Sequence, residues 1–188
     1  MKRNLVTAVL MTIVTTVLLG IIYPLTVTAL AQLLFHDKAN GQLIPGASGP
    51  VGSRIIGQTF VSNKYFHSRP SAAGNGYDAA NSGATNFGPT NQKLIDRVKG
   101  DTATLRAENP NRAVPADLVT TSASGLDPDI TPAAALFQVP RIARVRGLGE
   151  DRVRALVESH IQSRQLGFLG EPRVNVLELN LALDQASK

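Results

Sequence analysis

Three histidines are the side chains of this sequence best suited to move a proton near neutral pH: His36, His67 and His160. The first lies at the end of a long apolar run, and the third falls on the apolar face of a predicted helix, which favours a structural role. The second is flanked by polar side chains and precedes a loop rich in glycine and asparagine. We expect this region to be an interface, although an ordinary loop tucked against the sheet is the simpler alternative. The candidate interface residues are Tyr65, His67, Ser68 and Arg69.

A Ser–His–acid hydrolase site could be drawn around His67, with Ser68 or Ser71 as the nucleophile and Asp78 as the acid. Adjacent histidine and serine side chains do not usually face each other, however. The sequence also lacks the Gly-x-Ser-x-Gly elbow that exposes a nucleophilic serine. These two features argue against hydrolysis.

The glycine-rich loop does not have the pattern of a phosphate site, since it lacks both the Lys-Ser/Thr ending of a P-loop and the G-x-G-x-x-G order. No His-x-x-x-His or EF-hand pattern is present, and Asp127–Asp129 is most simply a turn before a helix cap. The chain has no cysteine, which removes disulfides, cysteine-ligated zinc and thiol nucleophiles. The residues therefore indicate no catalytic group, no metal site and no cofactor of the chain's own.

The basic charge of the chain is dispersed. Net charge is +5, of which Lys2 and Arg3 supply two units, so the part after residue 36 carries +3. No stripe of lysine and arginine interleaved with aromatic residues is present. We therefore expect no nucleic-acid partner.

Residues 5–35 contain no charged residue, and a bilayer core needs about 20 apolar residues in a helix. This run is longer than the 7–15 residues typical of a signal peptide, which favours a retained transmembrane helix. The alternative is an exported soluble binding protein or enzyme, released by cleavage after Ala31 in the Ala29–Ala31 triplet. Pro24 falls late in the span, where a kink is tolerable.

The basic residues predict the orientation of the helix. Lys2 and Arg3 precede it, whereas the far side begins with the nearly balanced segment 36–38, so the N-terminus is expected in the cytoplasm. The expected organisation is a cytoplasmic tail (1–4), a transmembrane helix (5–35), a linker (36–53) and one extracytoplasmic α/β domain (54–188).

Hydrophobic periodicity predicts a soluble domain of mixed α and β structure. Helices are expected from a cap at Thr90 or Asn91 to about residue 109, over 132–146 after a Thr131 cap, and over 150–165. Pro140 is expected to kink or break the second of these near Gln138. Strands are expected over 54–61 and 174–181, and residues 44–53, 71–88 and 120–128 are expected to form loops.

Seven segments, in order along nearly the whole chain, resemble the small C subunit of the bacterial Kdp potassium-transporting P-type ATPase. They are 23–25 (YPL), 39–41 (ANG), 57–60 (GQTF), 65–72 (YFHSRPSA), 119–127 (VTTSASGLD), 138–141 (QVPR) and 174–180 (VNVLELN).

This resemblance implies an accessory subunit in the bacterial inner membrane. Its partners would be a channel-like potassium-conducting subunit, a P-type subunit that hydrolyses ATP, and a very small membrane peptide. The family's C subunit is needed for assembly and has been proposed as a catalytic chaperone that raises the ATP affinity of the P-type subunit. ATP is implied by the resemblance alone, since the residues show no phosphate cradle and an extracytoplasmic domain cannot reach cytoplasmic ATP.

Overall fold

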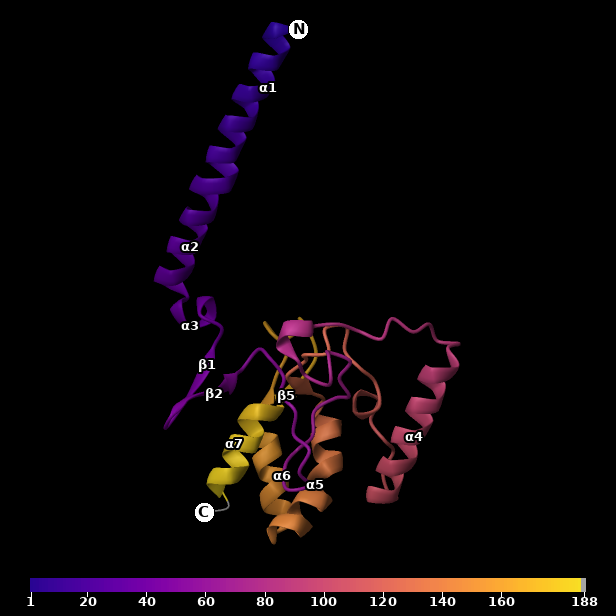
Figure 1. Cartoon of the computed structure of the whole chain (residues 1–188). Helices are drawn as coiled ribbons and strands as arrows, with labels where there is room; N and C mark the ends of the chain where they lie inside the picture. Colours follow the sequence, from indigo (N-terminus) through magenta and orange to yellow (C-terminus); the bar gives the residue numbers. More distant parts are fainter. Residues whose placement is uncertain (187–188) are drawn as a thin grey trace. The chain divides into compact units, whose positions relative to one another are not determined.

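The computed structural model describes residues 1–186 and divides into two compact units, Met1–Leu43 and the chain from Ile44 onward. The first unit is dominated by one rod, drawn in indigo in Figure 1, that joins α1 (Lys2–Thr15), the π-helical segment η1 (Thr16–Ile22) and α2 (Tyr23–Leu34). This helix of 33 residues is long and apolar enough to cross a membrane, and none of its described residues is buried. The predicted apolar helix is confirmed.

Two local features suit this rod to an apolar environment. The turns before Pro24 are π-helical, which widens the backbone where the proline ring would otherwise crowd the carbonyl of Gly20. The threonine hydroxyls also bond back to carbonyls one turn earlier, so they present no unpaired donor to lipid. These threonines are Thr7, Thr12, Thr15 and Thr26.

The segment between the rod and the domain contains regular structure that the sequence reading did not predict. Helix α3 (His36–Ala39) is followed by β1 (Leu43–Gly46) and β2 (Gly49–Ser53), which pair as a two-stranded sheet. Gly49 closes the turn with a φ of 137°, a conformation that other residues rarely adopt. Residues 44–53 are thus a hairpin, where a loop rich in Pro, Gly and Ser was expected.

Three helices and a small sheet form the core of the second unit. Helices α5 (Pro132–Arg146), α6 (Glu150–Ser159) and α7 (Val176–Ala186) lie side by side in Figure 1. The sheet has the order β3 (Asp129–Ile130), β5 (Arg173–Asn175), β4 (Ile161–Gln162), and both pairings are antiparallel. The largest side chains of this core include Phe66, Phe137, Ile142, Leu179 and Leu183.

Two of the predicted helices are confirmed with their caps. Thr131 accepts a hydrogen bond from Ala134 N at 3.1 Å and starts α5, and Asn91 accepts one from Lys93 N at 2.9 Å and starts α4 (Gln92–Glu108). Helix α5 does not break at Pro140, because it continues to Arg146, and the alternative of a kink near Gln138 stays a prediction. Buried contacts on both sides of the proline hold the helix together despite its missing hydrogen bond.

Three other predictions are corrected by the structure. The predicted strand 54–61 is a turn followed by irregular chain, whose Gly57 N donates to Leu126 O at 2.8 Å. The predicted helix 150–165 ends at Ser159, and β4 begins two residues later. Only residues 174–175 of the predicted strand 174–181 lie in a strand, because α7 begins at Val176. The unit also contains two 3-10 turns, Ala79–Asn81 and Ala116–Leu118, the first within the predicted loop 71–88.

Candidate functional site

Two buried amide side chains hold the backbone of the candidate segment against helices α5 and α7. Asn180 of α7 accepts from Phe66 N at 2.8 Å and donates to Phe66 O at 3.0 Å. Gln138 of α5 does the same for the next residue, accepting from His67 N at 2.8 Å and donating to His67 O at 3.0 Å. Each amide thus supplies both partners that a neighbouring β-strand would offer to an extended chain.

Arg141 fixes the start of the same segment. Its side chain is 5% exposed, and its guanidinium donates to Asn63 O at 2.6 Å and Tyr65 O at 2.9 Å. It also donates to Gln138 Oε1 at 2.6 Å and pairs with Glu108 Oε1 at 2.8 Å. The buried charge is therefore paired and surrounded by acceptors, as burial of a guanidinium requires.

Tyr65 is held at its ring and at its hydroxyl. The hydroxyl donates to Asp184 Oδ2 at 3.0 Å, and the guanidinium of Arg146 lies 4.8 Å from the ring centre. Arg146 also pairs with Asp184 at 2.8 Å and donates to Lys64 O at 2.7 Å. The polar end of Tyr65 is thus engaged within the domain.

Arg69 and Ser68 are likewise bonded to the domain itself. The Arg69 guanidinium pairs with Asp127 Oδ2 at 2.9 Å and donates to both oxygens of Thr120 at 3.3 Å. Ser68 Oγ donates to Gln58 O at 3.4 Å. The hydroxyl of Ser71 is engaged in its own loop, because it donates to Gly125 O and accepts from the backbone amides of Ala73 and Tyr77. Asp78 caps the turn at 79–81, so the conceivable Ser–His–acid set is not assembled.

The pKa of His67 lies below its ordinary value of 6.5, first because the ring is partly buried and second because Arg141 is positively charged. Its Nε2 lies 3.1 Å from Ser62 O, which fits a neutral ring that donates from Nε2. The nearby Glu108 acts in the opposite direction with a smaller effect. His67 is therefore a neutral structural contact near neutral pH.

A lowered histidine pKa makes stability depend on pH in a defined direction. Above pH 6.5 the ring is neutral in both the folded and the unfolded chain, and its contribution is fully present. As the pH falls below that value the unfolded chain takes up the proton first, so stability is lost until the folded pKa is passed. We expect His67→Gln to lose less stability than wild type as the pH is lowered from 6.5, measured by urea unfolding. The same dependence of the unfolding free energy on pH in the two proteins would contradict this prediction.

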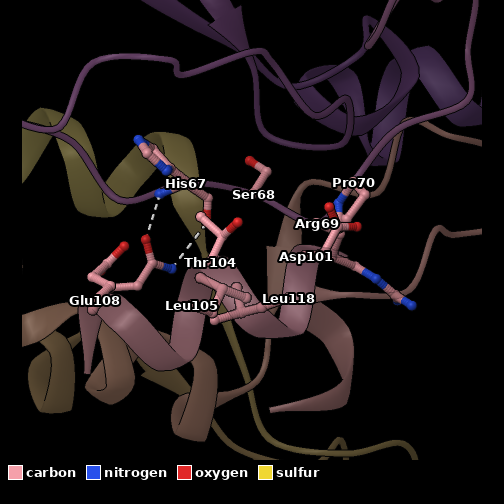
Figure 2. A pocket seen from close by; sticks show the side chains of 10 residues that line it. His67, Ser68, Arg69, Pro70, Asp101, Thr104, Leu105, Glu108 and Leu118 are labelled. Atoms are coloured by element: carbon pink, nitrogen blue, oxygen red, sulfur yellow. Dashed lines mark hydrogen bonds between the residues drawn. The ribbon is translucent and has the colours of Figure 1, made fainter. Parts of the chain in front are cut away.

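Residues His67, Ser68 and Arg69 contribute to the lining of two surface pockets. One, of about 290 Å³, lies between residues 67–70 and helix α4, as Figure 2 shows. Thr104, Leu105 and Glu108 line it from the α4 side, together with Asp101. The other, of about 370 Å³, also has His67, Ser68 and Arg69 in its lining and is bordered by residues 59–61 and Tyr77.

The side chains that line the first pocket do not have the pattern of a phosphate site. Arg69, the arginine in the lining of the first pocket, is already paired with Asp127, and the lining carboxylates Asp101 and Glu108 are paired with Arg97 and Arg141. Across the described residues 1–186, no group of three or more His, Cys, Asp and Glu side chains is placed to hold a metal. The hydrogen bonds from Gln138, Arg141 and Asn180 hold the segment 63–69 in place.

The structure thus brings Tyr65, His67, Ser68 and Arg69 together on one half-buried segment, and their use as a partner interface stays a prediction. The sequence reading missed the side chains that position this segment, which are Gln138, Arg141, Asn180 and Asp184. A signal was available, because Gln138, Arg141 and Asn180 are polar residues at buried positions of otherwise apolar helix faces.

Comparison with known proteins gives one consistent result. The family model described as KdpC, the c chain of a K+-transporting ATPase, matches residues 5–185. A protein of Koribacter versatilis named "Potassium-transporting ATPase KdpC subunit" is 65% identical, over 98% of this chain and 95% of its own length. Proteins of the same name from Rhodopseudomonas palustris (54% identical, 99% and 100%) and Caulobacter vibrioides (60% identical, 90% and 86%) are similar over comparable lengths.

Proposed function

This chain belongs to the KdpC family of K+-transporting ATPase c chains, and on that basis we propose that it is a non-catalytic accessory subunit of an ATP-driven potassium uptake complex. We propose that it assembles with a channel-like potassium-conducting subunit, an ATP-hydrolysing P-type subunit and a small membrane peptide. Its role is to allow the complex to assemble and to stabilise it. The observation that carries the proposal is the family match, which spans the apolar helix and the whole domain as one unit.

The side chains support an accessory role over a catalytic one. The polar groups that could do chemistry near His67 are bonded to backbone or to each other within the domain. The apolar rod, with no buried described residue, offers a surface for other membrane helices and for lipid. An anchored subunit that acts through contacts accounts for both features.

Loss of the chain tests this function directly. In a bacterium without its own copy of the gene, uptake at micromolar external potassium is expected to be lost and to return with the full chain. A chain beginning at Gln32 behind a cleaved signal should not restore uptake, because it lacks the helix. Normal high-affinity uptake without the chain would overturn the accessory role. Full rescue by the helix-free form would favour the exported soluble alternative.

We propose that the N-terminus is cytoplasmic and that the domain lies outside the bacterial inner membrane. Lys2 and Arg3 support this orientation through the positive-inside rule. Because the chain has no cysteine, Ser163→Cys at an exposed position gives a single thiol in the domain. An impermeant maleimide added to intact spheroplasts is expected to label it. Labelling only after lysis would place the domain in the cytoplasm.

We propose that any effect on the ATP affinity of the P-type subunit is transmitted through subunit contacts. The pairing of Arg69 with Asp127 and the carboxylates Asp101 and Glu108 in the lining of the pocket at His67 support an indirect route. Removing the chain is expected to raise the KM for ATP of the remaining complex. The full chain alone, in detergent, is expected to show no saturable binding of a fluorescent ATP analogue, and saturable binding would favour direct contact.

A further inference from the structure

The loop that joins β4 to β5 ends in an apolar tip, which is formed by Leu166, Phe168 and Leu169. These side chains are 83%, 69% and 48% exposed, so the domain leaves most of Leu166 and Phe168 and about half of Leu169 uncovered. Single exposed apolar residues are ordinary on protein surfaces, whereas three within four positions of one loop are a local concentration of exposed apolar side chains. The tip is therefore a candidate contact surface outside the site described above.

The backbone of this tip is held in one conformation. Gln165 and Leu169 exchange two backbone hydrogen bonds, both of 2.9 Å, and Gly167 N donates to Arg164 O at 3.2 Å. Leu166 has a φ of 52°, which a leucine rarely adopts. The strained backbone at Leu166 is not compensated by burial of its side chain within the domain, because that side chain is exposed. A loop whose backbone is already ordered loses little conformational entropy when it binds a partner.

The charges beside the tip indicate what covers it. Arg164 pairs with Glu171 at 2.6 Å, and Arg173 pairs with Asp129 at 2.9 Å. The basic groups at the base of the loop are therefore neutralised within the domain. A loop that binds an anionic bilayer typically places unpaired lysine or arginine beside its apolar residues. Paired charges around an apolar centre are instead typical of a protein interface, with its polar rim and apolar anchors.

We propose that the tip at Leu166–Leu169 docks into an apolar recess on another subunit of the potassium transporter. This inference rests on the proposed function, since it names the contact that the accessory subunit uses. Phe168 and Leu166 serve as the anchors, and the ion pairs at Arg164 and Arg173 form the rim.

A spin label beside the tip distinguishes a protein from a lipid environment. Gln165→Cys places a nitroxide next to the tip and leaves its three apolar side chains in place, and the chain has no other cysteine. In the reconstituted complex the label is expected to lose mobility and to become less accessible to both oxygen and a water-soluble nickel complex. Higher oxygen accessibility would mean lipid contact, and an unchanged spectrum would mean no contact. Either result overturns the proposal.

A paired substitution tests the energy of the contact. Leu166→Asn with Phe168→Ser removes the anchors, and asparagine accepts the positive φ of position 166 more readily than leucine. Titrated into complex that lacks the chain, this variant is expected to need at least about tenfold more protein for half-maximal ATPase activity. Ile55→Ser is the control, because Ile55 is also an exposed apolar residue of the domain (51%) but lies outside the tip and outside the pockets at His67.

The outcomes separate this inference from the proposed function. If wild-type chain restores activity while the double variant restores it at the same concentration with the same melting temperature, the docking contact is wrong and the accessory role stands. If wild-type chain itself restores nothing, the accessory role fails. A lower melting temperature for the double variant would trace its defect to folding, and the spin-label spectrum of Gln165→Cys then decides the docking contact by itself.

Discussion

Replacing Arg141 with methionine is expected to lower the free energy of unfolding by about 3–5 kcal/mol, the range for removing one partner of a buried ion pair. The change leaves the carboxylate of Glu108, which is 21% exposed, without its cation. It also leaves the carbonyls of Asn63 and Tyr65 without a donor. Methionine fills much of the same volume, so the loss reports the missing bonds more than a cavity. Urea unfolding of the full chain in detergent, followed by circular dichroism, measures it.

Two variants on the same helix make this prediction specific. Arg144→Met removes an exposed arginine three residues away and is expected to change stability by no more than about 0.5 kcal/mol. Arg141→Lys keeps the charge but cannot reproduce a guanidinium that bonds four acceptors, and it should recover only part of the loss. If Arg141→Met unfolds at the same urea concentration as Arg144→Met, the network does not stabilise the domain.

The elements that the sequence predicted correctly are those whose ends carry local signals. The cap at Thr131, with proline at the first helical position, marks α5, and Asn91 marks α4. Pro140 misled the prediction, because the local cost of proline is visible in the sequence but the packing that offsets it is not.

Helix α7 shows how one pattern can fit two structures. The alternation over 174–181 has the period of a strand, but the buried residues Val176, Leu179, Asn180 and Leu183 also follow the helical spacing of three and four. The deciding signal was Asn175, whose side chain accepts from Glu178 N at 3.1 Å and caps the helix. Asparagine at the second position of an apparent strand was therefore the clue to a helix start.

The candidate segment was predictable from its local composition, and its partners were not. Tyrosine, histidine and arginine at every second position singled out residues 65–69. Their partners are distant, since Gln138 lies 71 residues after His67 and Asn180 lies 114 residues after Phe66. A single sequence gives no means to pair such distant positions. Polar residues within an apolar stripe do indicate that a partner exists, because a buried amide without one is costly.

The second large effect is expected at Asn180, where leucine keeps the size of the side chain and removes both of its hydrogen bonds. Phe66 N and Phe66 O would then be buried without partners, since Phe66 itself is fully buried. Each unsatisfied group costs about 1–3 kcal/mol, so a total loss of about 2–6 kcal/mol is expected for the two groups. Asn111→Leu, at an exposed position, is the matched control and should be close to neutral.

Hydrogen exchange gives Asn180→Leu a local readout that a general loss of packing would not produce. The amide of Phe66 should exchange much faster in the variant, whereas the core of α5 keeps its protection, because only the segment 63–69 loses its partner. The double variant Asn180→Leu with Gln138→Met should lose less unfolding free energy than the sum of the two single variants, since both amides hold neighbouring peptide groups of one segment. Strict additivity would mean that Phe66 and His67 are held independently. Unchanged exchange at Phe66 would mean that Asn180 does not hold the segment.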